Sequence, residues 1–421
     1  MEENKFDNKA MVNWKRYTKD GEQKVKEIKR DEDETIKENL IIKGNNLPAL
    51  HSLKKQFAGK VKLIYIDPPY NTGNDGFKYN DNFNHSTWLT FMRNRLEVAR
   101  ELLRDDGVIF VQCDDNEQAY LKVLMDEVFG KDNFINTIAL KVSPPNGIKL
   151  THADITILKE KEYIHVYAKN KSGVKLFPQY KPADKWDAHY NKFIDNRNEK
   201  LENWKVRPLK DKLDEINLKP DLKNKDFENW IVKNSDRIFQ KVAQPKIKNK
   251  DKYNKDKIVP IEEMEGYSAY QGRQVQFLKN SIKDVGNKKT LARLACDLWD
   301  DIAFNNLFQE GNVKLKSGKK PEKLIYRIIN LTTKKEDLVM DFFLGSGTTC
   351  AVAHKMDRQY IGIEQMDYIE TIAVERMKNV IEGEQGGISK SVNWQGGGDF
   401  IYFELAKWNK TEMADPNFTI L

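Results

Sequence analysis

An apolar run that ends at two prolines constrains the fold of this chain more than any other feature. Residues 63–66 (Leu-Ile-Tyr-Ile) have the composition of an inner strand of a parallel sheet. Pro68 and Pro69 have no backbone N–H to donate, so the strand must end before them. Asp67 and Tyr70 are therefore predicted to lie at the carboxyl end of a central strand, where open α/β sheets bind their ligands.

Asp67, Pro68, Pro69 and Tyr70 together offer groups that can recognise a planar ring bearing an amine. The Asp67 carboxylate and the Pro68 carbonyl are two convergent acceptors for the two donors of such an amine. Tyr70 presents an aromatic face on which the ring can stack. The alternative interpretation is a proline-rich turn with a surface tyrosine, because four-residue motifs recur by chance.

A second pattern, typical of nucleoside binding, spans residues 338–364. A predicted strand over 338–343 is followed by a glycine-rich turn, a helix and a further strand. Gly345 and Gly347 permit a tight turn and a close backbone approach. Glu364 lies 17 residues past Gly347, close to the ~20 expected for a carboxylate on ribose hydroxyls. Dinucleotide binding is the rival interpretation, although the turn lacks the third glycine of that pattern.

The order of the predicted elements gives the fold class. Strands are predicted at 40–43, 61–66, 108–111, 134–142, 163–168, 338–343 and 360–363, and helices at 47–57, 88–103, 117–129, from 348 and at 368–381. A strand–helix–strand order implies a parallel sheet. We therefore predict an α/β fold with a three-layer, mostly parallel sheet.

The excess positive charge of the chain is concentrated in one segment. Between positions 181 and 260 there are 21 Lys and Arg against 14 Asp and Glu, whereas the rest of the chain is balanced at 50 against 50. A basic segment is the electrostatic footprint expected for nucleic acid. A solvated, lysine-rich insertion is the plainer alternative. Most aromatic residues of this region are expected to form the small core that an inserted domain needs.

Cysteine usage and hydropathy indicate the cellular compartment. Cys113, Cys296 and Cys350 are far apart and lack metal-ligand spacing, so neither a metal site nor disulfides are expected. No apolar run approaches the ~20 residues of a membrane span. The first residues do not resemble a signal peptide. We expect a cytoplasmic protein that is not associated with a membrane.

A polar stretch over residues 71–83 follows Tyr70 and contains Phe77, Tyr79 and Phe83. Loops beside a site often serve as lids, and aromatic residues in such a loop are suited to contacts with bases. A plain surface loop is an equally good interpretation of this composition.

The motif Asp67-Pro68-Pro69-Tyr70 resembles the catalytic motif of the DNA amino-methyltransferases, which transfer a methyl group from S-adenosylmethionine to N6 of adenine or N4 of cytosine. Aspartate at the first position resembles the adenine-specific members, whereas the cytosine-N4 members usually have serine there. The resemblance implies an enzyme that flips adenine out of the duplex. Asp67 and the Pro68 carbonyl would accept hydrogen bonds from N6, and Tyr70 would stack on the base.

Residues 341–349 closely resemble the S-adenosylmethionine motif of the same family, and residues 319–325 resemble the segment that closes over the methionine end of the cofactor. Residues 44–47 (Gly-Asn-Asn-Leu) lie where the family often has Gly-Asp near the cofactor adenine, so asparagine is a departure from the pattern. The implied cofactor-binding residues are Asn45, Asn46, Lys319, Pro321, Asp341, Phe343, Gly345, Ser346, Gly347, Thr348 and Glu364.

The catalytic motif precedes the cofactor motif, and the basic segment lies between them. This order resembles that of the β-class DNA adenine methyltransferases, and the chain is most similar to the modification subunits of type III restriction systems. The resemblance implies a circularly permuted, Rossmann-like methyltransferase sheet with an inserted target-recognition domain. The implied parts are an arm at 1–36, a catalytic half at 37–169, the insert at 170–318, a cofactor half at 319–382 and a tail at 383–421. Double-stranded DNA, a restriction subunit and a second copy of the chain are the implied partners.

Three other functions stay open at this point. An N4-cytosine or RNA methyltransferase would use the same fold. A non-catalytic DNA-binding protein would keep the nucleoside pocket as a sensor. A nicotinamide-dependent enzyme would use the glycine-rich turn for its dinucleotide.

Overall fold

The computed structural model describes residues 11–72, 83–142, 154–286, 288–305, 307–315 and 318–406. Contacts within the chain divide it into two compact units. Unit 1 comprises Met1–Pro178 and Cys296–Leu421, and unit 2 comprises Gln179–Ala295. Most of the proposed lid, residues 73–82, lies outside the described residues.

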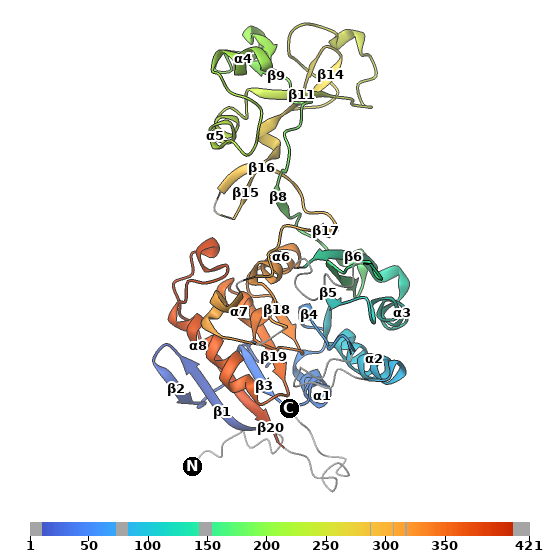
Figure 1. The fold of residues 1–421 in the computed structure, drawn as a ribbon, viewed down its shortest axis with the longest axis vertical. Helices are drawn as coiled ribbons and strands as arrows, with labels where there is room; N and C mark the ends of the chain where they lie inside the picture. The colour runs from blue at the N-terminus through green and yellow to red at the C-terminus, as the bar shows by residue number, and fades with distance from the viewer. Residues whose placement is uncertain are drawn as a thin grey trace. The chain divides into compact units, whose positions relative to one another are not determined.

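Within the described residues, unit 1 is built on an eleven-stranded sheet with the order β17-β6-β7-β5-β4-β18-β19-β3-β20-β1-β2 (Figure 1). Neighbouring strands from β5 to β20 are parallel, and β7 is antiparallel to both β5 and β6. The predicted α/β class and mostly parallel sheet are confirmed. The strands are β1 (Met11–Thr18), β2 (Gly21–Lys24), β3 (Leu40–Lys43), β4 (Val61–Ile66), β5 (Leu103–Cys113), β6 (Phe134–Lys141), β7 (Lys161–Ala168), β17 (Leu298–Trp299), β18 (Leu338–Asp341), β19 (Gln359–Glu364) and β20 (Phe400–Leu405).

The sheet is assembled from two parts of the chain that are far apart in sequence. β18 and β19 come late in the chain, yet they lie between β4 and β3, which come early (Figure 1). This is the permuted arrangement that the motif order predicts. Because β4 and β18 are parallel neighbours, the segments that follow them emerge at the same edge of the sheet.

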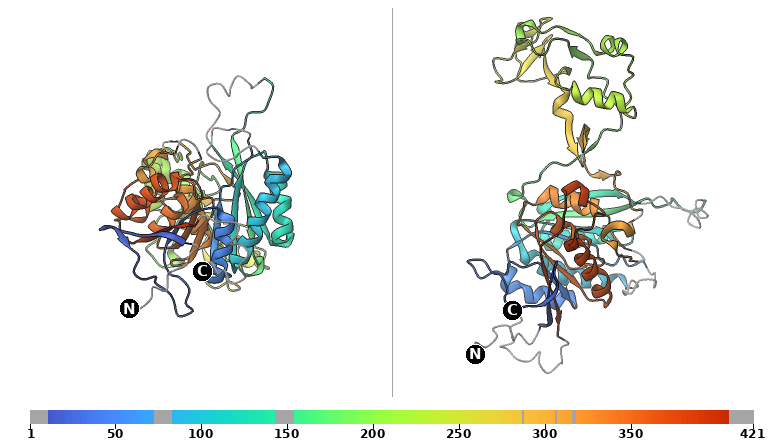
Figure 2. Two further views of the ribbon diagram at one scale, coloured as in Figure 1. Left: turned by 90° about the horizontal axis from the view of Figure 1, so that it is seen from below. Right: turned by 90° about the vertical axis from the view of Figure 1, so that its left-hand side faces the viewer.

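Helices cover both faces of this sheet and complete three layers (Figure 2). One face carries α1 (Asn46–Phe57), α2 (His85–Leu102) and α3 (Gln118–Phe129); the other carries α6 (Glu322–Thr332), α7 (Thr348–Lys355) and α8 (Glu375–Glu382). Each face has its own apolar core, formed by residues such as Leu50, Phe57, Leu96 and Met125 on the first and Ile328, Val352 and Met377 on the second. The predicted helix over 368–381 is present and contains a π-helical turn, Glu370–Val374, ahead of α8.

Local sequence explains why these elements begin and end where they do. Every residue of β4 is buried, as its apolar run predicts, and the strand stops before Pro68. The side chain of Asn45 accepts a hydrogen bond from the Leu47 N–H and caps α1. Asn84 caps α2 in the same way, through the Thr87 N–H.

Two segments predicted to be an arm and a tail belong instead to the sheet. β1 lies within the predicted arm and β20 within the predicted tail, and the two strands pair with each other. β20 also pairs with β3, and Phe403 on β20 is buried against Trp14, with ring centroids 4.3 Å apart. The prediction failed because a strand pattern does not reveal a partner at the other end of the chain.

Unit 2 contains a six-stranded sheet, β10-β9-β11-β14-β13-β12, and a three-stranded sheet, β15-β16-β8, within its described residues. Tyr190 and Phe227 are buried in one of its cores, so these aromatics are structural as predicted. The contact boundaries of unit 2 are narrower than the predicted 170–318, because β17 pairs with β6 in unit 1. The elements are β8 (Tyr180–Pro182), β9 (Lys192–Ile194), β10 (Val206–Pro208), α4 (Leu209–Glu215), α5 (Lys225–Lys233), β11 (Ile238–Val242), β12 (Val259–Pro260), β13 (Ser268–Tyr270), β14 (Arg273–Phe277), β15 (Ile282–Val285) and β16 (Lys288–Leu294).

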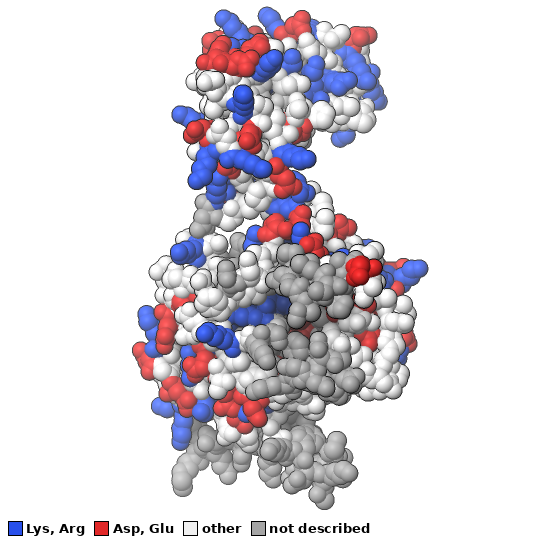
Figure 3. Space-filling view, viewed as in Figure 1, with Lys and Arg blue, Asp and Glu red and all other residues white. Residues whose placement is uncertain are grey.

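Charged side chains cover much of the visible face of unit 2, with Lys and Arg interspersed among Asp and Glu (Figure 3). Some of the basic side chains are paired, as in Arg207 with Glu215 and Lys288 with Glu228. No helix in the part of the chain that the structure describes is both long enough and apolar enough to cross a membrane.

Replacing Phe403 tests whether β20 is part of the core. Phe403 is 1% exposed, so we expect Phe403→Ala to lower the free energy of unfolding by about 3–5 kcal/mol through lost burial and a cavity. The measurement is urea unfolding, with Val12→Ala on the neighbouring β1, where the side chain is largely exposed, as the control. A loss below about 1 kcal/mol for Phe403→Ala would show that the last strand is dispensable.

Candidate active site

The residues of the Asp-Pro-Pro-Tyr motif lie at the carboxyl end of β4, as predicted. The glycine-rich turn follows the neighbouring strand β18, so the two motifs share one edge of the sheet. The Pro69 carbonyl accepts a hydrogen bond of 2.8 Å from the indole of Trp88, which is fully buried on α2. This contact fixes the proline turn against the helix layer.

Asp67 is held by a cation and a hydroxyl. The Lys320 ammonium lies 2.9 Å from Asp67 Oδ2, and the Tyr70 hydroxyl donates a hydrogen bond to Asp67 Oδ1. Lys320 also donates to the Tyr70 oxygen at 3.1 Å. Glu162, at the start of β7, is the fourth residue of this cluster. Its Oε2 atom lies 3.0 Å from the Tyr70 hydroxyl oxygen and 3.7 Å from the Lys320 ammonium.

A buried amide side chain holds Glu162 in this cluster. Gln112, at the end of β5, donates a 2.6 Å hydrogen bond to Glu162 Oε2. Its own carbonyl oxygen accepts a 2.7 Å hydrogen bond from the Tyr65 hydroxyl on β4. Gln112 is completely buried and Tyr65 nearly so, so these contacts replace the hydrogen bonds with water that both groups lose on folding.

Burial and charge oppose each other in this cluster. Burial raises the pKa of Asp67, Lys320 lowers it, and the nearby Glu162 raises it again, so the pKa stays above its usual value. Burial alone would lower the pKa of Lys320, but the two carboxylates raise it above the ordinary range. Burial likewise acts to raise the pKa of Glu162, but Lys320 and hydrogen bonds from Gln112 and Tyr70 outweigh it and leave that pKa lowered.

The glycine-rich turn requires glycine at two positions. Gly345 and Gly347 have φ values of 55° and 78°, in the left-handed region that other residues avoid. A Cβ on Gly347 would lie 3.3 Å from the Cβ of Ala373, so this position is also crowded. The predicted tight turn is therefore present.

Asp341 and Glu364 shape this turn with their carboxylates. Asp341 accepts hydrogen bonds from the Thr349 hydroxyl at 2.6 Å and the Phe343 N–H at 3.0 Å. Glu364 accepts from the Gly345 N–H at 2.9 Å and from the Tyr368 hydroxyl at 3.2 Å. Burial raises the pKa of Asp341 to about 7, and the two hydrogen bonds to it only partly offset that rise.

A pocket lies beside the turn, lined by Asn46, Pro69, Phe83, Phe91, Phe342, Phe343, Glu364 and Gln365. It combines aromatic rings with an amide and a carboxylate. Asn46 is fixed there, because its Nδ2 donates to the Phe342 carbonyl and its Oδ1 accepts from Arg95 Nε, both at 2.7 Å. Such a lining fits a flat heterocycle attached to a sugar.

The sequence matches the DNA methylase family over residues 61–375. The chain belongs to the DNA methylase family. It is 50% identical to the probable type III restriction-modification enzyme HindVI Mod subunit of Haemophilus influenzae, over 96% of this chain and 59% of that protein. It is 31% identical to the type III restriction-modification enzyme EcoPI Mod subunit of Escherichia phage P1, over 77% of this chain and 56% of that protein.

The chain is also similar in sequence to a type II methyltransferase. The chain is 30% identical to the type II methyltransferase M.KpnI of Klebsiella pneumoniae, over 74% of this chain and 75% of that protein. The chain spans less than two thirds of the length of the two type III relatives that it matches.

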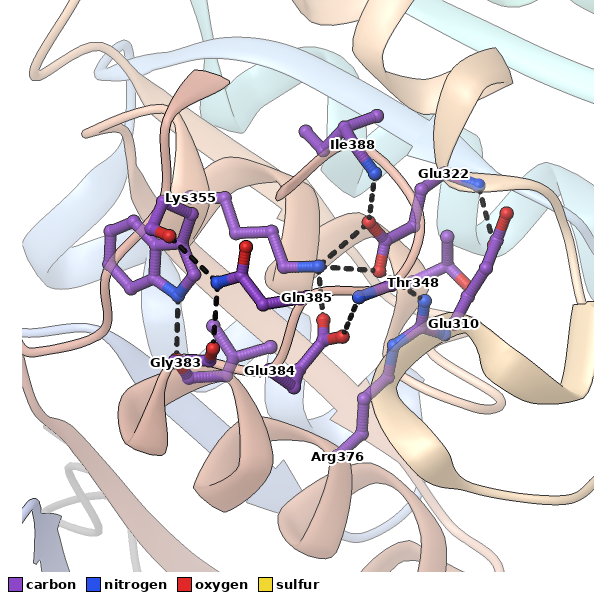
Figure 4. Close-up of polar contacts among 12 residues, drawn as sticks. Glu310, Glu322, Thr348, Lys355, Arg376, Gly383, Glu384, Gln385 and Ile388 are labelled. Carbon is purple, nitrogen blue, oxygen red and sulfur yellow. Dashed lines mark hydrogen bonds and ion pairs between the residues drawn. The ribbon is translucent and has the colours of Figure 1, made fainter. Parts of the chain in front are cut away.

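The segment 319–322 of this DNA methylase family member is anchored by buried charges (Figure 4). Glu322 is fully buried between Lys355 and Arg376, with 2.8 Å contacts to each. Arg376 also donates to the Thr348 hydroxyl at 2.6 Å, and this hydroxyl contacts the Lys320 carbonyl at 3.2 Å. The cluster thereby ties the start of α6 to the glycine-rich turn.

The structure places some of the predicted cofactor residues at the pocket, others in the turn, and three outside both. Asn46, Phe343 and Glu364 line the pocket, and Asp341, Gly345, Gly347, Ser346 and Thr348 build the turn beside it. Lys319 points elsewhere, because its ammonium donates to the carbonyls of Glu310 and Val313 at 2.6 and 3.0 Å. Asn45 is an exposed cap of α1, and Pro321 is the buried residue that precedes α6.

Sequence reasoning missed Lys320, Glu162 and Gln112. Lys320 lies inside the segment 319–325, in which the resemblance points to its neighbour Lys319. Glu162 begins an antiparallel strand, so it reaches the same sheet edge at which β4 ends. An isolated amide at the end of the apolar run of β5 is the signal that points to Gln112.

Gly347→Ala tests the demand for glycine in the turn. We expect a loss in the free energy of unfolding of about 1–2 kcal/mol from the left-handed backbone, and a further loss from the contact with Ala373. Gly59→Ala is the matched control, because Gly59 has φ of +69° and open space around its Cβ position. Equal losses in urea unfolding of the two variants would contradict the close approach at Gly347.

Asp341 should make stability depend on pH. In the unfolded chain an aspartate ionises near pH 4, whereas the pKa of Asp341 in the folded protein is about 7. The folded state therefore binds the extra proton between these values, and the free energy of unfolding falls as pH rises. Relative to Asp341→Asn, the free energy of unfolding of the wild type should fall by on the order of 2–3 kcal/mol between about pH 5 and pH 7.5. A constant difference across this range would show that Asp341 is ionised throughout.

Proposed function

We propose that the chain is a site-specific DNA methyltransferase that transfers a methyl group from S-adenosylmethionine to N6 of a flipped adenine. The observation that carries this proposal is that the Asp67 site and the nucleoside-type pocket share one sheet edge, with Pro69 lining the pocket. Membership of the DNA methylase family supports DNA as the substrate. Aspartate at position 67 favours adenine over cytosine as the target base.

The pocket residues fit S-adenosylmethionine. The rings of Phe91 and Phe343, whose centroids lie 5.9 Å apart, offer apolar surfaces for adenine, and Glu364 offers carboxylate oxygens for ribose hydroxyls. The backbone at Gly345 and Gly347 allows close approach of the rest of the nucleoside. When bound, the cofactor supplies an electrophilic methyl group on a sulfonium.

The Asp67 site would receive the target adenine. Asp67 and the Pro68 carbonyl accept hydrogen bonds from the amine, and Tyr70 stacks on the base. This orients the nitrogen lone pair towards the methyl group, so positioning supplies most of the rate enhancement. The amine nitrogen would gain a bond to the methyl carbon and release one proton to solvent, and the sulfur of the bound cofactor would keep the electron pair of the broken bond.

Recognition of the DNA sequence is assigned to the insert between the two halves, which unit 2 represents. Its net positive charge would hold phosphates, and its polar side chains would read base edges. The names of the type III relatives support a role as the modification subunit of a restriction-modification enzyme, alongside a separate restriction subunit. Two copies of the chain and a cytoplasmic location belong to the same proposal.

The test is methyl transfer from labelled S-adenosylmethionine to unmethylated genomic DNA, followed by nucleoside analysis. We expect N6-methyladenine from the wild type and a loss of roughly 100-fold or more in Asp67→Ala, because the amine loses its acceptor. Asp20→Ala, at an exposed position in the β1–β2 turn, is the control and should retain activity.

Each failure has a separate meaning. A product of N4-methylcytosine would show that the target base is cytosine and not adenine. Methylation of RNA alone would change the substrate class. Cofactor binding with no product on any nucleic acid would contradict a methyltransferase and favour a binding protein.

A further inference from the structure

The Lys320 ammonium occupies the position that an amine donor needs on Asp67. It lies 2.9 Å from Asp67 Oδ2, a hydrogen-bonding distance, and the other oxygen accepts from Tyr70. Both side chains are largely buried, with 11% of Lys320 and 18% of Asp67 exposed. A target amine that binds this oxygen would therefore compete with Lys320.

A second acceptor for Lys320 lies next to the first. Glu162 Oε2 is 3.7 Å from the same ammonium, is held in place by the Gln112 amide and lies 3.0 Å from the Tyr70 hydroxyl oxygen. Two carboxylates thus share one cation. A shift of the ammonium towards Glu162 would free Asp67 and still leave Lys320 paired, which avoids the cost of an isolated buried charge.

We propose that Lys320 is a positioning residue that holds the place of the target amine on Asp67, and that Glu162 takes over its ammonium when the amine enters. This inference rests on the proposed function. The entering amine is neutral, so the exchange leaves the net charge of the site unchanged. Lys320 remains near Asp67, whose pKa it lowers.

The same geometry predicts opposite electrostatic effects of the two residues on Asp67. Lys320 lowers the pKa of Asp67, and Glu162 raises it, against a background in which burial raises it most. Within the described residues, the titratable groups that face Asp67 are Lys320 ahead of α6, Glu162 on β7, Tyr65 on β4, Tyr70 in its own turn, Cys113 at the end of β5 and Asp341 at the end of β18. Of these, Lys320 alone is a cation.

A purely structural role is the alternative to this proposal. In that case Lys320 only attaches this segment, ahead of α6, to β4. Removing a neighbouring charge shifts the titration of Asp67 under either proposal, so the pKa changes test only whether the two residues act on Asp67. The proposals differ in the complex with DNA, where the structural role keeps Lys320 on Asp67 and the positioning role moves its ammonium onto Glu162.

The experiment measures the pKa of Asp67 in the wild type, Lys320→Met, Lys320→Arg and Glu162→Gln. Aspartate labelled with ¹³C at the carboxyl carbon is titrated by NMR in the absence of cofactor and DNA, and Asp67→Asn assigns the signal. The acid limb of the rate of methyl transfer to unmethylated plasmid DNA is measured in parallel. Lys323→Met is the control, because Lys323 lies on the same segment but contacts Asp301.

We expect Lys320→Met to raise the pKa of Asp67 by roughly one to three pH units and to move the acid limb to higher pH. Glu162→Gln should move both to lower pH, and Lys320→Arg should restore the wild-type values. An active wild type whose Lys320→Met and Glu162→Gln variants keep its acid limb would overturn this inference alone. A wild type that transfers no methyl group would overturn the proposed function on which it rests.

Discussion

The ion pair between Asp67 and Lys320 is the interaction on which the site depends. Asp67 follows β4 in the first part of the chain, and Lys320 precedes α6 in the second, with unit 2 between them in sequence. Burial disfavours each charge, and the opposite charge of the partner offsets part of that cost. The pair therefore joins the two halves of a permuted sheet at the edge where both motifs emerge.

A second set of buried charges supports the first. Glu322, Lys355 and Arg376 hold the start of α6 against the glycine-rich turn, and this sets the backbone that carries Lys320. Glu384, from the segment predicted to be a tail, also contacts Lys355. The residues after α8 are thus part of the support for the site, which agrees with the pairing of β20 between β3 and β1 in the sheet.

Local sequence patterns predicted the fold class, the end of β4 and the turn at Gly345 and Gly347, because each depends on neighbouring residues. The pairing of β1 with β20 and the entry of Glu162 into the site depend on strands that meet from distant parts of the chain. One-dimensional patterns carry little information on such pairing. Lys320 was missed for a different reason: adjacent lysines are alike in sequence, and only the path of the backbone shows which one faces Asp67.

In this proposal the target amine and Lys320 compete for one oxygen of Asp67. A structure of the protein with S-adenosylhomocysteine and DNA that carries its target adenine would show which of them occupies it. We expect the adenine amine within hydrogen-bonding distance of Asp67, with the Lys320 ammonium moved onto Glu162. An adenine bound in the site while Lys320 stays at its present distance of 2.9 Å from Asp67 Oδ2 would contradict it.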